Sequence, residues 1–169
     1  HVLPDGSMMK GRIWYAATES TQPSSITYLD EVKTFLLRSI LSVKSDGSVA
    51  LENMGLGATI DYPKPAPLIE RLLFSTGETS GTVLDYFGGS GTTGHAVINL
   101  NREDGGQRKF ILVEMGDYFD TVLLPRIKKV TFTPEWKDGK PKRLATPVET
   151  ERSPRIVKVI RLESYEDAL

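Results

Sequence analysis

Hydrophobic and polar positions divide the chain into a weakly patterned first part and a strongly patterned remainder. Residues 11–17 mix isoleucine, tryptophan and tyrosine with small residues and predict a short strand. Residues 28–43 place apolar side chains three and four positions apart, which is a weak helical signal. Residues 45–57 contain glycines, and we expect a loop there. Residues 1–60 are therefore assigned to one loosely defined segment.

The pattern becomes clearer from residue 61 onward. Three prolines make residues 61–67 extended, and residues 68–73 then predict a short helix that starts just after the last proline. Two apolar runs, residues 82–87 and 109–115, predict buried strands, and residues 92–100 between them predict a helix. A strand, a helix and a strand within about 33 residues form a βαβ unit, whose two strands are parallel neighbours.

Two more elements are predicted beyond this unit. Residues 117–130 carry apolar side chains on one side of a helix, although Pro125 interrupts the pattern. Residues 155–162 alternate apolar and charged side chains and predict a further strand. The chain is therefore expected to be an α/β fold with three to four mainly parallel strands and flanking helices.

Composition removes several functional classes. The chain has 169 residues, of which 39% are apolar and 25% charged, so it is globular, and no apolar run approaches the length of a membrane span. It has no cysteine and two histidines, which excludes thiolate chemistry, argues against a zinc site and fits a cytoplasmic protein. The net charge of −1 gives no general footprint for nucleic acid, and the basic residues 137–143 are expected to form a solvated loop.

The stretch TVLDYFGGSGTTGHAV, residues 82–97, places four glycines and three hydroxyl residues within positions 88–94, where a predicted strand leads into a predicted helix. Gly89, Gly91 and Gly94 satisfy the pattern G-x-G-x-x-G, and Glu114 lies 20 residues beyond Gly94 at the end of the next strand. Alone, this arrangement is typical of a dinucleotide-binding turn, so a nicotinamide-dependent oxidoreductase is one hypothesis. A Walker-type phosphate loop is excluded, because no Gly-Lys-Ser/Thr follows.

Asp85 favours a different ligand. A carboxylate at the strand end beside the loop repels a pyrophosphate and attracts an ammonium or a sulfonium group. S-adenosylmethionine carries both cations, contains no phosphate and has a ribose for Glu114. The glycines would let the backbone approach its methionine moiety closely. The residues therefore favour S-adenosylmethionine over NAD, and a tight turn without a ligand is the structural alternative.

The sequence around this loop also resembles a known family. LDYFGGSGTTGHAV is similar to the cofactor-binding motif of the amino-group DNA methyltransferases, and DYPKPAPLIERLL, residues 61–73, is similar to the motif that precedes it in one circularly ordered class. Residues 100–115 and 155–169 resemble the modification subunit of type III restriction systems, and GRIWY, residues 11–15, fits the region before them. The resemblance implies a Rossmann-like fold for S-adenosylmethionine-dependent methyl transfer to adenine N6 in DNA.

The resemblance also implies roles for individual residues. Residues 1–60 would end the target-recognition region, residues 61–130 would form the cofactor-binding core, and residues 131–169 would lead into a following segment. The residues expected to line the methionine end of the cofactor are Asp85, Phe87, Gly88, Gly89, Ser90 and Gly91. Lys64, Pro65 and Leu68 would lie against the cofactor from the other side. Glu114 would bond the ribose hydroxyls, and Met115 would pack on the adenine ring.

One departure from the family is notable. No Asp-Pro-Pro-Tyr tetrapeptide, which holds the target amino group in the family, occurs in these residues. With a first residue that is not methionine, this predicts a piece of a longer polypeptide that is inactive alone. The expected partners are DNA, the restriction subunit of the same system and further copies of the chain, because an incomplete parallel sheet leaves an edge and apolar faces uncovered. No membrane is expected as a partner.

Other candidate residues have simpler structural interpretations. His95, at the start of a predicted helix, is interpreted as a packed or capping histidine, because no nucleophile is apparent beside it. Trp14 and Tyr15 are interpreted as a core pair and not as a base-stacking platform. A non-enzymatic interaction module, in which residues 155–169 dock a partner subunit, is a third hypothesis for the chain.

Overall fold

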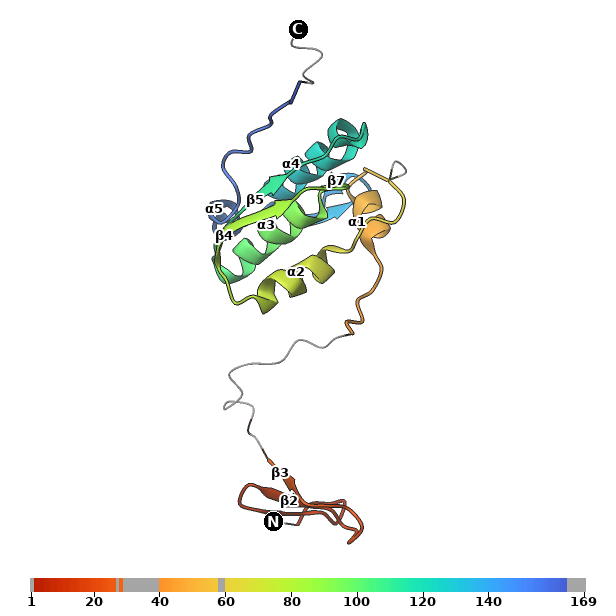
Figure 1. Ribbon diagram of the computed structural model, residues 1–169, viewed down its shortest axis with the longest axis vertical. Coiled ribbons are helices and arrows are strands. Elements are labelled where there is room, and N and C mark those ends of the chain that lie inside the picture. Colours follow the sequence, from red (N-terminus) through yellow and green to blue (C-terminus); the bar gives the residue numbers. More distant parts are fainter. Residues whose placement is uncertain (1, 27, 29–39, 58–59, 164–169) are drawn as a thin grey trace. The chain divides into compact units, whose positions relative to one another are not determined.

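The computed structural model describes residues 2–26, 28, 40–57 and 60–163. Its contacts divide the chain into two compact units, His1–Ile40 and Leu41–Leu169 (Figure 1). Most of the helix predicted over residues 28–43 lies outside the described residues, and residues 40–43 are not helical. The functional boundaries expected at residues 60 and 130 remain predictions.

The first unit contains a small antiparallel sheet. Its strands β1 (Met8–Lys10), β2 (Ile13–Tyr15) and β3 (Ser24–Ser25) pair in the order β1-β2-β3. Gly11 adopts a φ of 61° in the turn between the first two strands, a conformation that glycine reaches without steric cost. The strand predicted over residues 11–17 is therefore confirmed, in a shorter form.

The second unit is built around the predicted βαβ element. Strand β4 (Ser80–Asp85) leads through the glycine loop into helix α3 (Thr92–Asp104), which returns to strand β5 (Gln107–Leu112). The two strands are parallel, with Ser80 opposite Gln107 and Asp85 opposite Leu112. A mixed α/β fold with a parallel sheet is thus confirmed.

Helix α3 is the centre of the second unit. It contacts both strands of the parallel pair and two other helices, α2 (Ala66–Ser75) and α4 (Leu124–Phe132) (Figure 1). Helix α2 begins directly after Pro65, two residues earlier than predicted, and Pro67 occupies its first turn, where a missing N–H costs nothing. The core cluster comprises Met54, Ile98 and Val130, with Leu56, Phe110 and Trp136 packed against it.

Gly94, the third glycine of the motif, lies where α3 packs closely on its neighbours. A Cβ atom at this position would lie 2.6 Å from Cδ1 of Ile127 and 3.1 Å from Cδ1 of Leu112. The bare backbone of α3 therefore lets the helix approach β5 and α4 closely. This part of the glycine pattern serves the fold directly.

The chain between α4 and β5 contains an irregular turn. A π-helix, η2 (Phe119–Leu123), runs directly into α4, and Pro125 stands at the start of α4. Proline has no N–H to donate to the preceding turn, and the wider turn accommodates this gap. The helix predicted over residues 117–130 is confirmed together with its interruption.

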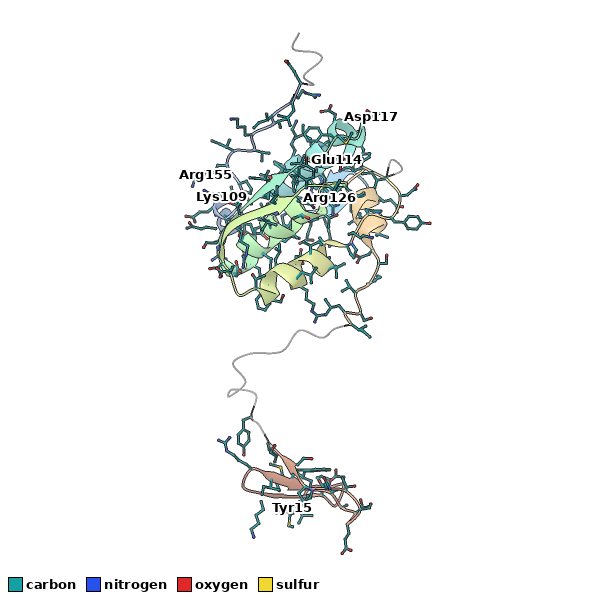
Figure 2. The ribbon with its side chains drawn as sticks, in the orientation of Figure 1. Tyr15, Lys109, Glu114, Asp117, Arg126 and Arg155 are labelled. Atoms are coloured by element: carbon teal, nitrogen blue, oxygen red, sulfur yellow. The ribbon has the colours of Figure 1, made fainter. Side chains whose placement is uncertain are left out.

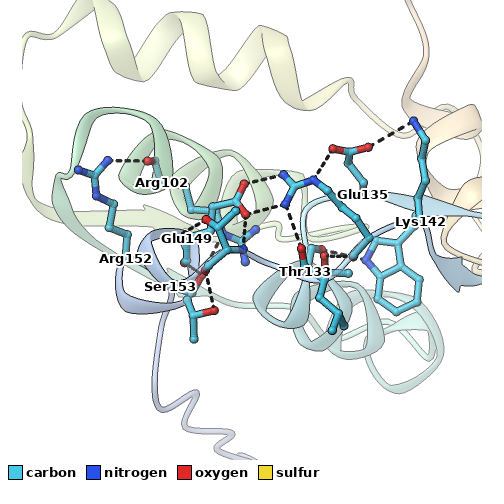
Figure 3. Close-up of polar contacts among 12 residues, drawn as sticks. Arg102, Thr133, Glu135, Lys142, Glu149, Arg152 and Ser153 are labelled. Carbon is cyan, nitrogen blue, oxygen red and sulfur yellow. Dashed lines mark hydrogen bonds and ion pairs between the residues drawn. The ribbon is translucent and has the colours of Figure 1, made fainter.

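The segment after α4 forms a surface hairpin and a short helix. Strands β6 (Trp136–Lys137) and β7 (Lys140–Pro141) pair across a turn, and α5 (Pro147–Glu151) follows with a capping box between Thr146 and Glu149. Arg143 bonds the carboxylates of Glu135 and Glu149, and Arg152 donates to the carbonyl of Arg102 (Figure 3). The basic residues 137–143 are thus largely a hairpin held by ion pairs.

Two of the predicted elements are wrong. Residues 45–57, expected to be a loop, contain the helix α1 (Gly47–Asn53). A helix of seven residues is not stable alone, so this one depends on tertiary contacts. The glycines in this stretch indicate a loop, and the sequence pattern does not show those contacts. Residues 155–162, expected to be a strand, have no regular secondary structure and pair with no strand of the described residues. Alternation makes a segment compatible with a sheet, but a strand also needs an edge to pair with.

The parallel sheet is also smaller and more exposed than expected. Within the described residues it has two strands, β4 and β5, where three to four were predicted. Helix α3 covers one face, whereas Leu84 and Ile111 on the other face are 63% and 54% exposed. The prediction of fully buried strands is therefore wrong for this face. No helix within the described ranges is long and apolar enough to cross a membrane.

Gly47 provides a test of the unexpected helix. A Cβ atom on Gly47 would lie 2.0 Å from the carbonyl oxygen of Pro63, which is backbone and cannot rotate away. We expect Gly47→Ala to lower the free energy of unfolding by about 2 kcal/mol or more, as measured by urea denaturation. Ser48→Ala, on the exposed side of the same turn, is the control and should change it by less than about 0.5 kcal/mol. Equal stability of the two variants would contradict this packing.

Candidate functional site

The carboxyl ends of the two parallel strands bring the predicted site residues to one edge. The N–H of Val113 donates to the carbonyl of Asp85 at 2.9 Å, and the N–H of Gly88 donates to the carbonyl of Val113 at 2.8 Å. These bonds extend the ladder past the ends of the strands. Asp85 and Glu114 therefore both lie at this edge of the sheet, with the glycine loop between them. Ligands of open parallel sheets bind at this position.

The glycine loop needs backbone conformations that other residues avoid. Gly89 and Gly91 have φ angles of 54° and 78°, in the left-handed region. Gly91 is the N-cap of α3, and no side chain caps the first turn of the helix. Instead, the N–H of Gly91 donates to the carbonyl of Gly88 at 2.8 Å, which closes the turn. The loop is compact: Gly88, Ser90 and Gly91 are buried, and Gly89 is half-buried.

Glu114 is bonded to the backbone of the loop. The N–H of Gly89 donates to Oε2 at 2.8 Å, and those of Met115 and Gly116 donate to Oε1 at 2.8 Å. Burial alone would raise the pKa of the Glu114 carboxyl, but these three donors outweigh it, so the pKa lies below its ordinary value. The carboxylate is therefore ionised at neutral pH, and Oε2 keeps acceptor capacity for a further donor.

Asp85 is bonded to both ends of the loop. The N–H of Phe87 donates to Oδ1 at 3.1 Å, and the hydroxyl of Thr93 donates to Oδ2 at 2.6 Å. The side chain is half-buried and is fixed between the strand end and the first turn of α3. Each carboxylate oxygen has one donor in the protein, which leaves acceptor capacity for a ligand.

Arg126 is a site residue that the sequence prediction missed. Its side chain is 0% exposed, and its Nη1 donates to the carbonyl and the hydroxyl of Ser90, at 3.2 Å and 2.9 Å, and to the hydroxyl of Thr92 at 3.0 Å. Figure 2 shows Arg126 and Glu114 in the second unit. A signal was present, because Arg126 falls on the apolar side of its helix, between Leu123 and Ile127.

His95 completes this buried group. The Nε of Arg126 donates to its Nδ1 at 3.2 Å, so the imidazole carries its proton on Nε2. Burial, together with the positive charges of Arg126 and Arg102, lowers the pKa of His95 to about 3. The interpretation of His95 as a packed histidine is confirmed, and the neutral ring acts as a hydrogen-bond acceptor.

The segment before α2 joins the site through one hydroxyl. Thr92 donates from its Oγ1 to the carbonyl of Lys64 at 3.1 Å. Pro65 is buried beside this contact, Leu68 is half-buried on α2, and the side chain of Lys64 is exposed. The structure therefore brings residues 64–65 to the start of α3, as the family motif implied, although their contact with a cofactor remains a prediction.

Two predicted site residues contribute an open apolar rim. Phe87 is 83% exposed and packs edge-to-face on Tyr86, with 5.5 Å between the ring centroids. Met115 is 97% exposed. Gly88 and Ser90, in contrast, are buried in the loop. The predicted residues thus divide into a bonded group around Asp85, Gly89 and Glu114, and an apolar rim whose role remains a prediction.

Comparisons with known proteins agree with this geometry. A DNA methylase family matches residues 50–123, which contain the glycine loop and Glu114. The chain is 36% identical over 108 residues to the type III restriction-modification enzyme StyLTI Mod subunit of Salmonella typhimurium, covering 64% of this chain and 15% of that protein. It is 39% identical over 94 residues to the EcoPI Mod subunit of Escherichia phage P1, covering 55% of this chain and 13% of that protein.

A shorter stretch of the chain is similar to a methyltransferase of another type, type II. The chain is 44% identical over 54 residues to the type II methyltransferase M.KpnI of Klebsiella pneumoniae, covering 32% of this chain and 13% of that protein. The chain thus spans 13 to 15% of the length of these relatives. The resemblance to DNA methyltransferases and to type III modification subunits is confirmed by these matches.

The depressed pKa of His95 predicts a pH-dependent stability. Because the unfolded histidine takes up a proton below its ordinary value of 6.5 and the folded one does not until about 3, stability falls as the pH drops through this window. Between about pH 7.5 and 5 the loss from this group should be about 2 kcal/mol. His95→Asn keeps an acceptor near the position of Nδ1 and cannot titrate. Between the same two pH values, the unfolding free energy of this variant should therefore fall by about 2 kcal/mol less than that of the wild type. Parallel pH profiles from urea unfolding of the two proteins would contradict the buried neutral state.

Proposed function

We propose that this chain is the cofactor-binding part of a DNA adenine-N6 methyltransferase that takes its methyl group from S-adenosylmethionine, within a type III restriction-modification system. The observation that carries the proposal is the arrangement at one edge of the parallel pair, where a bare glycine loop lies between two bonded carboxylates, Asp85 and Glu114. The matches to a DNA methylase family and to type III Mod subunits support the same conclusion.

The charges of the site favour S-adenosylmethionine over NAD. A pyrophosphate on the loop would need the N–H groups of the turn, and the N–H of Gly89 is already bonded to the carboxylate of Glu114. It would also approach the carboxylate of Asp85 within the same loop. A sulfonium or ammonium group gains from both carboxylates and needs no phosphate donors. The oxidoreductase hypothesis is therefore the weaker one.

The bonded group and the apolar rim suggest how the cofactor would be held. The methionine end would lie on residues 87–91, with its ammonium toward Asp85. The ribose hydroxyls would donate to Glu114, whose Oε2 retains acceptor capacity, and the adenine would pack on Met115. Residues 64, 65 and 68 would close the other side, which their link to Thr92 supports. In this arrangement residues 61–130 form the cofactor-binding core of a Rossmann-like fold.

Methyl transfer requires mainly that the protein align the methyl donor with the nucleophile. S-adenosylmethionine supplies an electrophilic methyl group on its sulfonium, and an exocyclic adenine nitrogen must meet it in line at about 3–3.5 Å. The glycine loop and the two carboxylates would fix the position of the sulfonium from the protein side. The target base would be held elsewhere, because no Asp-Pro-Pro-Tyr occurs in these residues. DNA and a restriction subunit are the partners that this function requires.

The uncovered face of the parallel pair supports self-association of the chain as given. Leu84 and Ile111 stand beside each other on adjacent strands and are both exposed. Parallel sheets are normally covered on both faces. We expect Leu84→Lys to shift sedimentation toward the monomer at a given concentration. Val148→Lys, on the exposed surface of α5, is the control, and a wild-type protein that is monomeric throughout would contradict the expectation.

Calorimetric titration tests the cofactor directly. S-adenosylmethionine or S-adenosylhomocysteine should bind the chain, and NAD should not. Asp85→Asn keeps the acceptor for Phe87 but removes the charge, so it should weaken S-adenosylhomocysteine binding about tenfold or more. Asp138→Asn is the matched control, because this aspartate sits in the hairpin turn with a φ of 50° that asparagine also adopts. Binding of NAD by the wild-type chain, or equal affinity of the wild type and the Asp85 variant for S-adenosylhomocysteine, would overturn the proposal.

A further inference from the structure

The most unusual group in the second unit is the buried guanidinium of Arg126. All of its acceptors are neutral: the carbonyl and hydroxyl of Ser90, the hydroxyl of Thr92 and Nδ1 of His95. The ion pairs among the described residues involve other side chains. Burial lowers the pKa of Arg126 to about 10, which still leaves it charged at neutral pH. The fold therefore keeps a positive charge directly behind the glycine loop.

Stability alone does not account for this charge. Removing an ion from water costs several kcal/mol, and well-packed apolar residues often replace buried charged groups without loss. Leu123, Ile127 and Val130 on the same side of the helix are buried apolar residues, so an apolar side chain would suit position 126. The acceptors on the guanidinium, by contrast, are confined to the loop and the first turn of α3.

The guanidinium holds two chain segments through one hydroxyl. Thr92 accepts from Arg126 on its Oγ1 and donates its single hydroxyl proton to the carbonyl of Lys64. With that proton committed, the hydroxyl of Ser90 is left as the donor in the 3.1 Å contact between the two hydroxyls. Arg126 thus fixes the direction of the hydrogen bonds from the loop to residue 64. No bond of Arg126 reaches Asp85, Glu114 or Met115.

We propose that Arg126 is a positioning residue that holds residues 90–92 and the carbonyl of Lys64 in register for the amino-acid end of the cofactor. It does not contact the nucleoside end, which the proposed function assigns to Glu114 and Met115. This inference rests on the proposed function for the identity of the ligand. Its structural part, the rigid link between the loop and residue 64, can be measured without any ligand.

Two ligands that differ only in the amino-acid end separate this role from a general loss of stability. S-adenosylhomocysteine carries the amino-acid group, and 5′-methylthioadenosine has the same nucleoside without it. Arg126→Met should weaken binding of S-adenosylhomocysteine about tenfold or more and change binding of 5′-methylthioadenosine less than about twofold. Arg126→Lys, which keeps the charge but has no planar fork, should show an intermediate loss for the first ligand alone. Equal losses for both ligands, or no loss, would overturn the inference.

Arg102 supplies the matched control. It is also a buried arginine, 8% exposed, and it donates to neutral acceptors, the hydroxyl of Ser153 and the carbonyl of Thr131 (Figure 3). It lies near the opposite end of α3 from the glycine loop. Arg102→Met should therefore lower stability and leave the affinities for both ligands unchanged. If Arg126→Met does not fold, Arg126→Lys against this control decides the question.

Amide hydrogen exchange gives the readout that needs no ligand. The N–H of His95 is bonded to the carbonyl of Gly91, and the N–H of Gly105 is bonded to that of Asn101 at the other end of the same helix. Arg126→Met should speed exchange at His95 and leave Gly105 close to wild type. Uniform acceleration along α3 would show a merely structural role and overturn the inference. If wild type binds neither ligand while this local effect is seen, the proposed function fails, and with it the assignment of the ligand, whereas the link between the loop and residue 64 stands.

Discussion

The second unit depends on a positive charge buried among neutral acceptors. The guanidinium of Arg126 cannot reach water, so its donors must be satisfied by Ser90, Thr92 and His95. This requirement orients the hydroxyls of the loop and keeps His95 neutral. It also ties α4 to the start of α3, and through Thr92 to residue 64. These bonds hold the loop from the side of α4, and the bonds of Gly88 and Gly89 to Val113 and Glu114 hold it from the side of β5.

Three charged side chains surround the glycine loop and determine the electrostatics of this edge of the sheet. Glu114 and Asp85 are each bonded to backbone N–H groups of the loop, so two negative charges are held on either side of it. Behind it lies one positive charge, out of reach of solvent. We expect the two carboxylates to favour a ligand with a cationic centre and neutral hydroxyls over one with a phosphate bridge.

The parallel pair of strands, β4 and β5, has one covered face and one exposed face. Its first face is covered by α3, with Gly94 permitting the close approach, while its second face carries exposed Leu84 and Ile111. The relatives are several times longer than this chain, which spans 13 to 15% of their length. Residues 155–162 have a strand-like sequence but belong to no sheet of the described residues. These features are consistent with a core whose remaining surfaces are completed by further chain or by another copy.

The sequence alone determined the βαβ unit, the glycine turn and the resemblance to DNA methyltransferases, because these depend on local periodicity and on residue types at fixed spacing. It also placed Asp85 and Glu114 at neighbouring strand ends. The tertiary structure alone decided that residues 47–53 form a helix, because that helix is stabilised by contacts with Pro63 and the core. It alone showed that residues 155–162 belong to no sheet within the described residues. It also identified Arg126, since the role of a buried charge depends on the acceptors that distant segments bring to it.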